Sequence, residues 1–256
     1  MTPAVRENPE LFPSGAELAV AAAERFVTVA AAAIASTETF SVALSGGSTP
    51  RAMFTLLASP EFSRRVEWGR VHVFWGDERC VPPDDEASNY RMACETLIDH
   101  VPLRPENVHR IRGEDPPAAA AERYERELRA AFATPTGGPR VLAGSRFDLV
   151  LLGLGTNGHT ASLFPHLSAV REQTRWTMAE NVEVLQMWRI TLTPPILNAA
   201  AEALFLVSGR EKAAVLRRVL YGARESDDLP AQVIAPVDGR LRWFVDAAAA
   251  SELPAP

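Results

Sequence analysis

The amino-acid sequence predicts a single α/β domain in which a mostly parallel sheet carries helices on both faces. Short apolar runs alternate with helix-length segments along the whole chain, which is the order that helix-connected parallel strands produce. The most apolar run, residues 147–152, lies between Arg146 and Gly153, as expected for a strand buried on both faces. Residues 134–144 are rich in glycine and proline. We interpret them as a surface loop rather than a domain linker, because the buried strand that follows needs neighbours.

The predicted domain therefore spans residues 1–256, with residues 1–13 as a loosely ordered N-terminal segment. At 47% hydrophobic residues the chain can bury a substantial core. No apolar run reaches the roughly 18 residues of a membrane span, and the alanine-rich stretch 19–35 contains Glu24 and Arg25, which indicates an amphipathic helix. The N-terminus lacks the basic-then-apolar order of a signal peptide.

Charge and cysteine content narrow the class of protein further. The net charge of −6 argues against nucleic acid as a partner. Cys80 and Cys94 show no metal-ligand spacing, and we interpret them as free thiols in a reducing cytoplasm. We therefore expect a cytoplasmic protein without membrane or nucleic-acid partners. Because the net charge is negative, binding of an anionic small substrate would require several basic residues to lie close together.

The individual elements follow from local signals. Ser14 and Glu17 have capping-box spacing, which predicts a helix from Ser14 to about Ala35. Pro50 suits the first position of a helix. Apolar runs predict strands at 40–44, 71–75, 147–152, 188–192, 203–207 and 241–245, and a short strand is expected at 107–111. Further helices are expected over 51–58, 88–99, 116–132, from Pro194, and from about 210 to 221, with a closing helical turn at 247–250.

The turn between the strand at 40–44 and the next helix indicates an anion site. It contains two adjacent glycines, Gly46 and Gly47, followed by the hydroxyls of Ser48 and Thr49. Small residues here leave backbone N–H groups exposed at a helix N-terminus, which favours phosphate. The alternative is a plain tight turn.

Charged residues occupy two other strand ends. Asp77, Glu78 and Arg79 follow the strand at 71–75, where the carboxyl edge of the sheet is expected, and the alternative is that they are simply solvated. Lys212 falls in the first turn of a predicted helix, where a cation is unfavourable unless an anion is bound.

The loop after the strand at 147–152 is the strongest candidate for chemistry. Its glycines Gly153, Gly155 and Gly158 match the dinucleotide-binding pattern, but Pro165 follows too soon for the long helix that pattern requires, and Glu172 does not end an apolar run. Nucleotide binding is therefore disfavoured. A tight turn with an incidental His159 is the second alternative, and a catalytic His159 is the favoured interpretation.

Five blocks of sequence resemble the 6-phosphogluconolactonase family. They are L-S-G-G-S-T-P (44–50), G-D-E-R-C-V-P-P-D-D-E-A-S-N-Y (76–90), G-L-G-T-N-G-H-T-A-S-L-F-P (153–165), R-I-T-L (189–192) and S-G-R-E-K (208–212). The resemblance implies a Rossmann-like fold, shared with glucosamine-6-phosphate deaminases and ribose-5-phosphate isomerases. It also implies hydrolysis of 6-phospho-D-glucono-1,5-lactone to 6-phosphogluconate in the pentose phosphate pathway. This chain departs from the family at Asn157, where the family usually has aspartate, two residues before the histidine.

The chemistry of lactone opening suits these residues. His159 can act as the base for water and return the proton, since its pKa lies near neutrality. Arg79 can stabilise the oxyanion. We assign Asp77 to the catalytic residues, together with His159 and Arg79. Phosphate contacts are expected from Gly46, Gly47, Ser48, Thr49, Arg189 and Lys212, and loop support from Gly155, Asn157 and Gly158. If His159 is not the base, Asp77 and Glu78 are the next candidates. The scheme requires no metal and no cofactor.

Two rival functions stay open at this level. An amino-sugar-phosphate deaminase or isomerase would need an extra carboxylate where Leu163, Phe164 and Pro165 stand. A non-catalytic sugar-phosphate sensor would dispense with His159 and add a partner-binding module. The sequence is compatible with a monomer or a small homo-oligomer.

Overall fold

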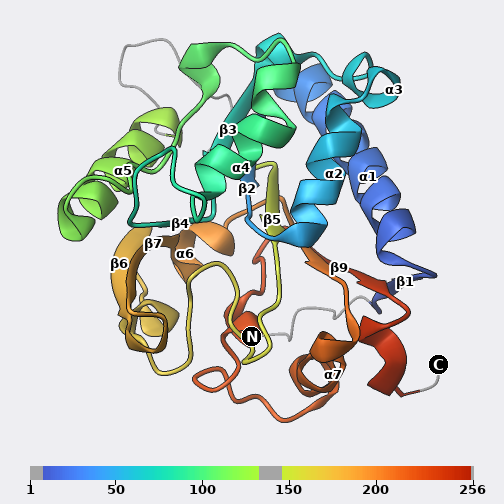
Figure 1. Ribbon diagram of the computed structural model, residues 1–256, viewed down its shortest axis with the longest axis vertical. Helices are drawn as coiled ribbons and strands as arrows, with labels where there is room; N and C mark the ends of the chain where they lie inside the picture. Colours follow the sequence, from blue (N-terminus) through green and yellow to red (C-terminus); the bar gives the residue numbers. More distant parts are fainter. Residues whose placement is uncertain (1–7, 133–145, 255–256) are drawn as a thin grey trace.

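The computed structural model describes residues 8–132 and 146–254. Figure 1 shows a parallel sheet of six strands beside a smaller antiparallel sheet of three strands. The predicted α/β class and the single domain are confirmed. The parallel sheet has the order β1-β9-β8-β5-β2-β3, formed by β1 (Glu10–Phe12), β9 (Arg240–Asp246), β8 (Glu202–Val207), β5 (Leu149–Leu152), β2 (Phe40–Leu44) and β3 (Val71–Trp75).

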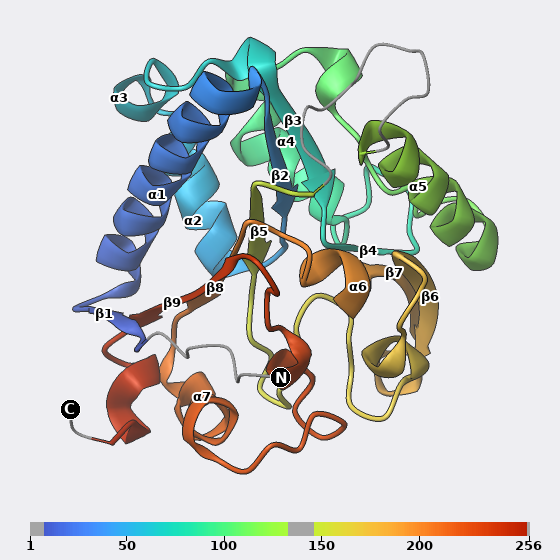
Figure 2. The same cartoon turned by 180° about the vertical axis from the view of Figure 1, so that it is seen from behind.

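Helices lie on both sides of this sheet. In Figures 1 and 2, α1 and α2 lie together above β8 and β9, and α7 lies below them. Every residue of β2, β3, β5 and β8 is buried, which explains why these strands are mostly apolar in sequence. The α-helices are α1 (Gly15–Thr37), α2 (Ser48–Ala58), α3 (Pro60–Ser63), α4 (Asn89–Thr96), α5 (Pro117–Phe132), α6 (Pro194–Leu197) and α7 (Ala213–Tyr221).

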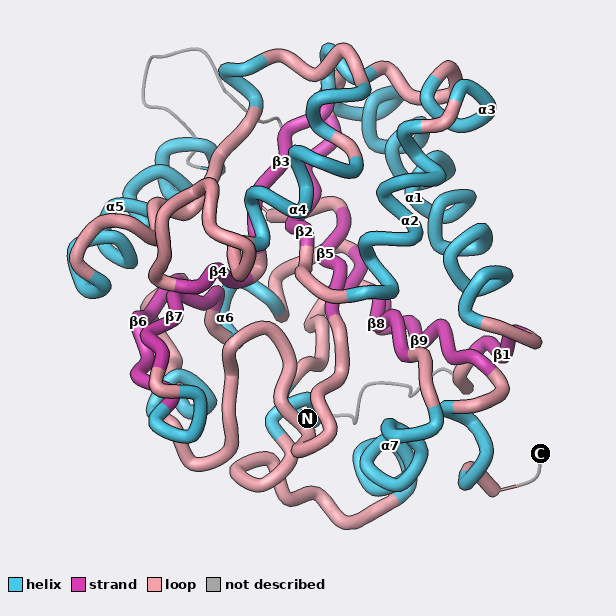
Figure 3. Tube along the Cα trace, in the orientation of Figure 1, coloured by secondary structure: helices cyan, strands magenta, loops and turns pink. Residues whose placement is uncertain are grey.

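Short 3₁₀ turns complete the described chain. They are Trp68–Arg70, Ile98–His100, Pro105–Asn107, Ser168–Arg171, Glu183–Leu185, Arg210–Lys212, Pro230–Val233 and Ala249–Glu252. Between β5 and the small sheet the chain is mostly loop, as Figure 3 shows. The predicted surface loop at 134–144 lies outside the described residues.

Helix α1 is the only helix in the described chain that is long and apolar enough to cross a membrane by length and composition. Its capping is as predicted, since Ser14 Oγ accepts a hydrogen bond from Glu17 N–H at 3.3 Å. Its apolar face packs into the core, and Arg25 forms an ion pair with Glu202 of β8. The length and hydropathy of α1 are therefore explained by its place in the core.

The N-terminal segment differs from the prediction in part. Residues 10–12, expected to be loosely ordered, form β1 and pair in parallel with β9. Phe12 packs against Phe244 with ring centroids 5.0 Å apart, and Glu10 pairs with Arg242 at 2.8 Å. A three-residue edge strand depends on these partners, more than 200 positions away, and so leaves no local signal.

The strand expected at 107–111 is not formed. The segment makes a single parallel bridge, Val108 to Val73, after the 3₁₀ turn Pro105–Asn107. The side chain of Asn107 donates to the carbonyl of Val71 at 3.0 Å, and it thereby occupies a backbone acceptor beside β3. The pairing with β3 therefore stops after one residue.

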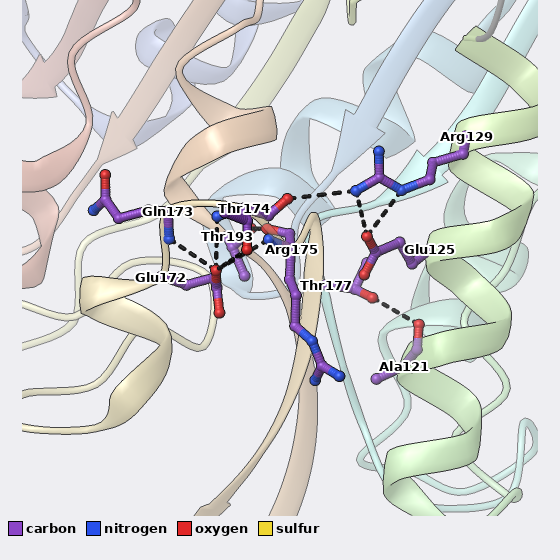
Figure 4. Close-up of polar contacts among 9 residues, drawn as sticks. All are labelled: Ala121, Glu125, Arg129, Glu172, Gln173, Thr174, Arg175, Thr177 and Thr193. Carbon is purple, nitrogen blue, oxygen red and sulfur yellow. Dashed lines mark hydrogen bonds and ion pairs between the residues drawn. The ribbon is translucent and has the colours of Figure 1, made fainter.

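The small sheet was only partly predicted. It has the order β4-β7-β6, with β4 (Asp77–Arg79), β7 (Met187–Leu192) and β6 (Thr177–Val182), and only β7 was expected. Figure 4 shows how α5 holds the start of β6. Thr177 Oγ1 donates to the carbonyl of Ala121 at 2.6 Å, and Arg129 reaches the carbonyl of Thr174 at 3.4 Å. These contacts join segments that are far apart in the sequence.

Glu172, the residue that a dinucleotide site would require as a ribose ligand, has a structural role instead. Figure 4 shows its carboxylate accepting hydrogen bonds from the backbone N–H groups of Gln173, Thr174 and Arg175, at 2.8, 2.7 and 3.0 Å. These bonds, chiefly the one from Arg175, lower the pKa of Glu172 to about 2. The loop at 153–158 therefore lacks the acidic partner of a nucleotide-binding fold.

Two helix starts differ from expectation by a few residues. Helix α2 begins at Ser48 rather than at Pro50, because Gly47 adopts a φ of 110° and reverses the chain two residues earlier. Lys212 ends the 3₁₀ turn that precedes α7 rather than lying inside the α-helix.

We expect the protein to lose stability as the pH falls through the titration of His72. This side chain is 7% exposed in β3, with its Nδ1 3.2 Å from Nε2 of His109, whose Nδ1 lies 3.0 Å from a carboxylate oxygen of Glu127. Burial, with smaller effects of His109 and Arg104 against Glu106, lowers the pKa of His72 to about 4. An unfolded histidine binds its proton near pH 6.5. Between about pH 6.5 and 4 the unfolded chain therefore binds more protons than the folded chain. The free energy of unfolding decreases as the pH falls through this range.

Thermal melts between pH 7.5 and 4.5 check this expectation. His72→Gln, which cannot titrate, should lose less stability over this range than wild type, by on the order of 2 kcal/mol. His100→Gln, at an exposed position, is the control. Parallel curves for wild type and His72→Gln would show that the acid sensitivity arises elsewhere.

Candidate active site

A cavity of about 230 Å³ opens at the carboxyl ends of the central strands, between the two sheets. Its walls come from the loops after β2 and β5, from β4 and β7 of the small sheet, and from the first residue of α4. The lining residues are Ser45, Gly46, Gly47, Asp77, Arg79, Asn89, Gly153, Leu154, Gly155, His159, Ala161, Arg189 and Lys212.

Most of the predicted site residues meet in this cavity. Gly46, Gly47, Gly155 and all the predicted polar residues of the catalytic and cationic sets line it, namely Asp77, Arg79, His159, Arg189 and Lys212. Ser48 and Thr49 lie in the first turn of α2, beside the wall rather than in it. Asn157 and Gly158 directly precede His159 in the loop. Gly158 has a φ of 85°, which the turn requires.

The imidazole of His159 is held on three sides. Its ring stacks on Phe164 with centroids 4.1 Å apart. On another side it lies so close to Gly155 that a Cβ there would be 2.0 Å from Nδ1. Nδ1 itself is 2.6 Å from Oδ1 of Asn157. The glycine is therefore required for the ring to reach this position, and Nε2 is the nitrogen left for a ligand.

His159 is a neutral imidazole at physiological pH. Burial lowers its pKa to about 4, and the charges of Arg189, Lys212 and Arg79 act in the same direction, whereas Asp77 opposes them. A neutral imidazole can accept a proton from water, which is the function of a general base.

Asp77 is organised by three partners from three segments. Its Oδ2 accepts from Ser162 Oγ at 2.6 Å and lies 3.6 Å from a guanidinium nitrogen of Arg189. Its Oδ1 accepts from Asn89 Nδ2 at 3.3 Å. The carboxylate is 5% exposed, and it is the only carboxylate among the residues that line the cavity.

Three cations face the same space. Arg79 donates to the carbonyl of Ala87, and its Nε is buried without a partner among the described residues. Nε of Arg189 is likewise buried and unpaired within the described chain, and its guanidinium lies 5.6 Å from the ring of Phe164. Lys212 completes the set from the turn after β8. Unsatisfied buried donors in a cavity indicate an anionic ligand, since such donors are costly to bury without an acceptor.

The glucosamine-6-phosphate isomerase/6-phosphogluconolactonase family matches residues 13–243. This chain belongs to that family. The 6-phosphogluconolactonase of Nostoc sp. is 37% identical over 252 residues, which cover 97% of this chain and 99% of the relative. That of Haemophilus influenzae is 37% identical over 208 residues, or 81% and 85% of the two chains. The solved 6-phosphogluconolactonase from Trypanosoma cruzi aligns with a TM-score of 0.84 at 28% identity, covering 98% of this chain and 99% of its own.

Within this member of the family, Glu78 has a structural role that the sequence left open. Its carboxylate accepts from the backbone N–H groups of Arg79, Asn89 and Tyr90 at 2.8, 2.7 and 2.7 Å, and from Ser88 Oγ at 3.1 Å. Burial raises its pKa, and these bonds oppose the effect. Glu78 therefore fastens the loop between β4 and α4, and it does not line the cavity.

Asn89 and Ser45 were not singled out by the sequence. Nδ2 of Asn89 donates to the carbonyl of Asp77 at 3.0 Å, and its Oδ1 lies where a Cβ on Gly46 would be only 1.9 Å away. The hydroxyl of Ser45 is buried without a partner among the described residues. Both residues lie within the blocks 44–50 and 76–90 that carry the family resemblance.

The composition of the chain also distinguishes Lys212. All but one of the 26 lysine and arginine residues are arginine, and Lys212 is the single lysine. An ammonium group is a compact charge on a flexible stem, whereas arginine offers a planar fork. A chain that otherwise uses arginine has its one lysine in the cavity wall.

A larger cavity, about 780 Å³, lies elsewhere, at the opposite end of the sheet around α6. Two of its charged residues have partners of their own, since Arg171 forms an ion pair with Asp227 at 2.6 Å and Glu172 accepts hydrogen bonds from its own backbone turn. No group of three histidine, cysteine or acidic side chains that could hold a metal occurs within the described chain. The smaller cavity is therefore the candidate active site.

Proposed function

We propose that this protein hydrolyses 6-phospho-D-glucono-1,5-lactone to 6-phosphogluconate. The observation that carries the proposal is a neutral, immobilised His159 facing a cavity whose other charged residues are three cations and one carboxylate. Such a site suits an anionic substrate. Its reaction requires a base that removes a proton from water, and it develops negative charge on the carbonyl oxygen. The relatives named above support the choice of substrate.

The reaction follows from these positions. His159 Nε2 takes a proton from water as the water attacks the lactone carbonyl. The guanidinium group of Arg79 stabilises the oxyanion that forms, and Arg189 keeps its predicted role as a phosphate contact. The negative charge of Asp77 raises the pKa of His159, against burial and the three cations, and it therefore favours the imidazolium. The imidazolium then returns the proton to the leaving ring oxygen.

The substrate phosphate would bind away from the reacting carbonyl. The turn at Gly46 and Gly47 presents the N-terminus of α2, and Lys212 supplies a charge from the other side of the cavity. Binding energy from this remote group can position the carbonyl against His159. Ser48 and Thr49 contribute through the first turn of α2 rather than from the cavity wall.

Neither rival is favoured by the geometry. An amino-sugar-phosphate deaminase needs a carboxylate in the segment after the histidine, where Phe164 instead stacks on the imidazole. A sensor has no use for an immobilised base. A cysteine nucleophile is also disfavoured, because burial and the charge of Glu78 raise the pKa of Cys80 to about 11. The cytoplasmic location and the oligomeric state stay predictions.

Acid release from freshly prepared 6-phosphogluconolactone tests the proposal directly. The purified chain should accelerate hydrolysis far above the spontaneous rate, which is subtracted with an enzyme-free blank. Unphosphorylated gluconolactone should be a poor substrate. Equal rates with and without enzyme, or equal activity on the two lactones, would reject the proposal.

Removing the Lys212 ammonium should weaken use of the phosphorylated substrate. Lys212→Ala is expected to lower kcat/KM roughly tenfold or more, because a charge-assisted hydrogen bond is worth on the order of 1.5–3 kcal/mol. Steady-state kinetics measure this loss. Arg210→Ala removes an exposed cation two residues away and is the control. Equal losses in both variants would indicate a long-range charge effect and not a contact.

A further inference from the structure

We infer that Asn157 is a positioning residue that locks the neutral His159 in the tautomer with the proton on Nδ1, so that Nε2 faces the cavity as an acceptor. The inference rests on the proposed function for its catalytic consequence, but its structural content is independent of the substrate. It concerns the position at which this chain has an amide in place of a carboxylate.

The contact geometry assigns the donor and the acceptor. Oδ1 of Asn157 lies 2.6 Å from Nδ1 of His159 and 3.3 Å from the backbone N–H of the same residue. A backbone N–H can only donate, so the atom that it meets is the amide oxygen. An amide oxygen can only accept, and therefore Nδ1 carries the proton. In a neutral imidazole the other nitrogen, Nε2, is then the free base.

Close packing confines the ring to the plane in which Nδ1 meets Asn157. Phe164 covers one side at 4.1 Å, and the backbone at Gly155 lies against Nδ1. The N–H of Gly155 also donates to the carbonyl of His159 at 2.8 Å, which closes the loop around the side chain. Asn157 itself is exposed and lies outside the cavity wall. It therefore acts on the reaction only through the imidazole.

The neutral amide also leaves the imidazolium without an adjacent counter-charge. The charged groups that act on the imidazole are Asp77, Arg79, Arg189 and Lys212, and three of these four disfavour protonation. A carboxylate at position 157 would add a direct partner for Nδ1–H and raise the basicity of Nε2. The amide keeps the orientation without that increase, so the free base persists to lower pH.

Nuclear magnetic resonance of ¹⁵N-histidine-labelled protein tests the tautomer without any substrate. His159→Gln identifies the His159 signals by their loss. The expected result is a protonated Nδ1 and an unprotonated Nε2 in the wild type, and a mixture of both tautomers in Asn157→Ala. Thr156→Ala, at the exposed neighbouring position, should keep the wild-type pattern. A wild-type His159 protonated on Nε2 would overturn the inference, whatever the enzyme's activity.

Kinetics supply the second measurement. Asn157→Ala should lower kcat about tenfold or more with little change in KM, since the contact affects the base and not the phosphate grip. Asn157→Asp should keep kcat near wild type and move the acidic limb of the rate profile upward by about one pH unit or more. An Asn157→Asp limb at the wild-type pH would refute the role of the neutral amide. Absence of lactonase activity in wild type would reject the proposed function alone, because the resonance result stands without it.

Discussion

Replacing His159 by alanine should reduce kcat on the order of 10²–10⁴-fold, the usual contribution of a general base. The imidazole is the one titratable ring in the described cavity wall, and its Nε2 is the nitrogen without a protein partner in the contacts described above. KM should change much less, because the phosphate contacts lie at the α2 turn and Lys212. His159→Asn should be equally poor, since an amide forms hydrogen bonds but does not accept a proton.

The pH profile of the wild type gives a second view of the same group. The imidazole must be neutral to act, so kcat/KM should stay level from neutral pH downward and fall as the pH approaches about 4. His100→Ala, an exposed position outside the cavity, is the control for substitution of a histidine. A folded His159→Ala enzyme within a few-fold of wild type would transfer the role of base to Asp77.

Gly155→Ala should be nearly as damaging, although it removes no functional group. The added Cβ would lie 2.0 Å from Nδ1 and 2.1 Å from Cε1 of His159, closer than any two such atoms approach. The imidazole must leave its place between Gly155 and Phe164, and a displacement of about 1 Å can cost on the order of 10²-fold in rate. We expect kcat to fall by that order, with KM largely retained.

The matched control for this variant is Gly69→Ala. Its new Cβ would meet Arg104 at an ordinary contact distance of 3.5 Å, far from the cavity, so activity should be unchanged. Circular dichroism and thermal melts establish that both variants are folded. If Gly155→Ala retained wild-type kcat, the ring of His159 would have room that the structure does not show, and its clamped position would not matter for catalysis.

The buried framework follows from the sequence alone. The strands β2 and β3 begin and end where the apolar runs 40–44 and 71–75 predicted, because strands covered on both faces are apolar at most positions. Helix α1 begins after Ser14 as its capping pattern requires. These signals are local, and each depends on a few adjacent residues.

The edges and the small sheet could not be predicted in the same way. β1 depends on β9, and β4 depends on β7, whose residues lie more than 100 positions away. A three-residue strand such as Asp77–Arg79 is polar and too short to show a period of two. Its conformation is determined by the partner that it meets and not by its own composition.

The same distinction applies to the site. The sequence by itself predicted which loops form the candidate site, because glycine turns and charged residues follow buried strands, and parallel strands bring their carboxyl ends to one edge. It also located His159, Arg79, Arg189 and Lys212. Only the tertiary structure decided their relations. The register of β4 on β7 sets Arg79 opposite Arg189, the burial of Glu78 under a loop makes it structural, and the fold of 153–159 directs Asn157 to Nδ1 of His159. These outcomes depend on distances between segments remote in the chain, which no local pattern of residues encodes.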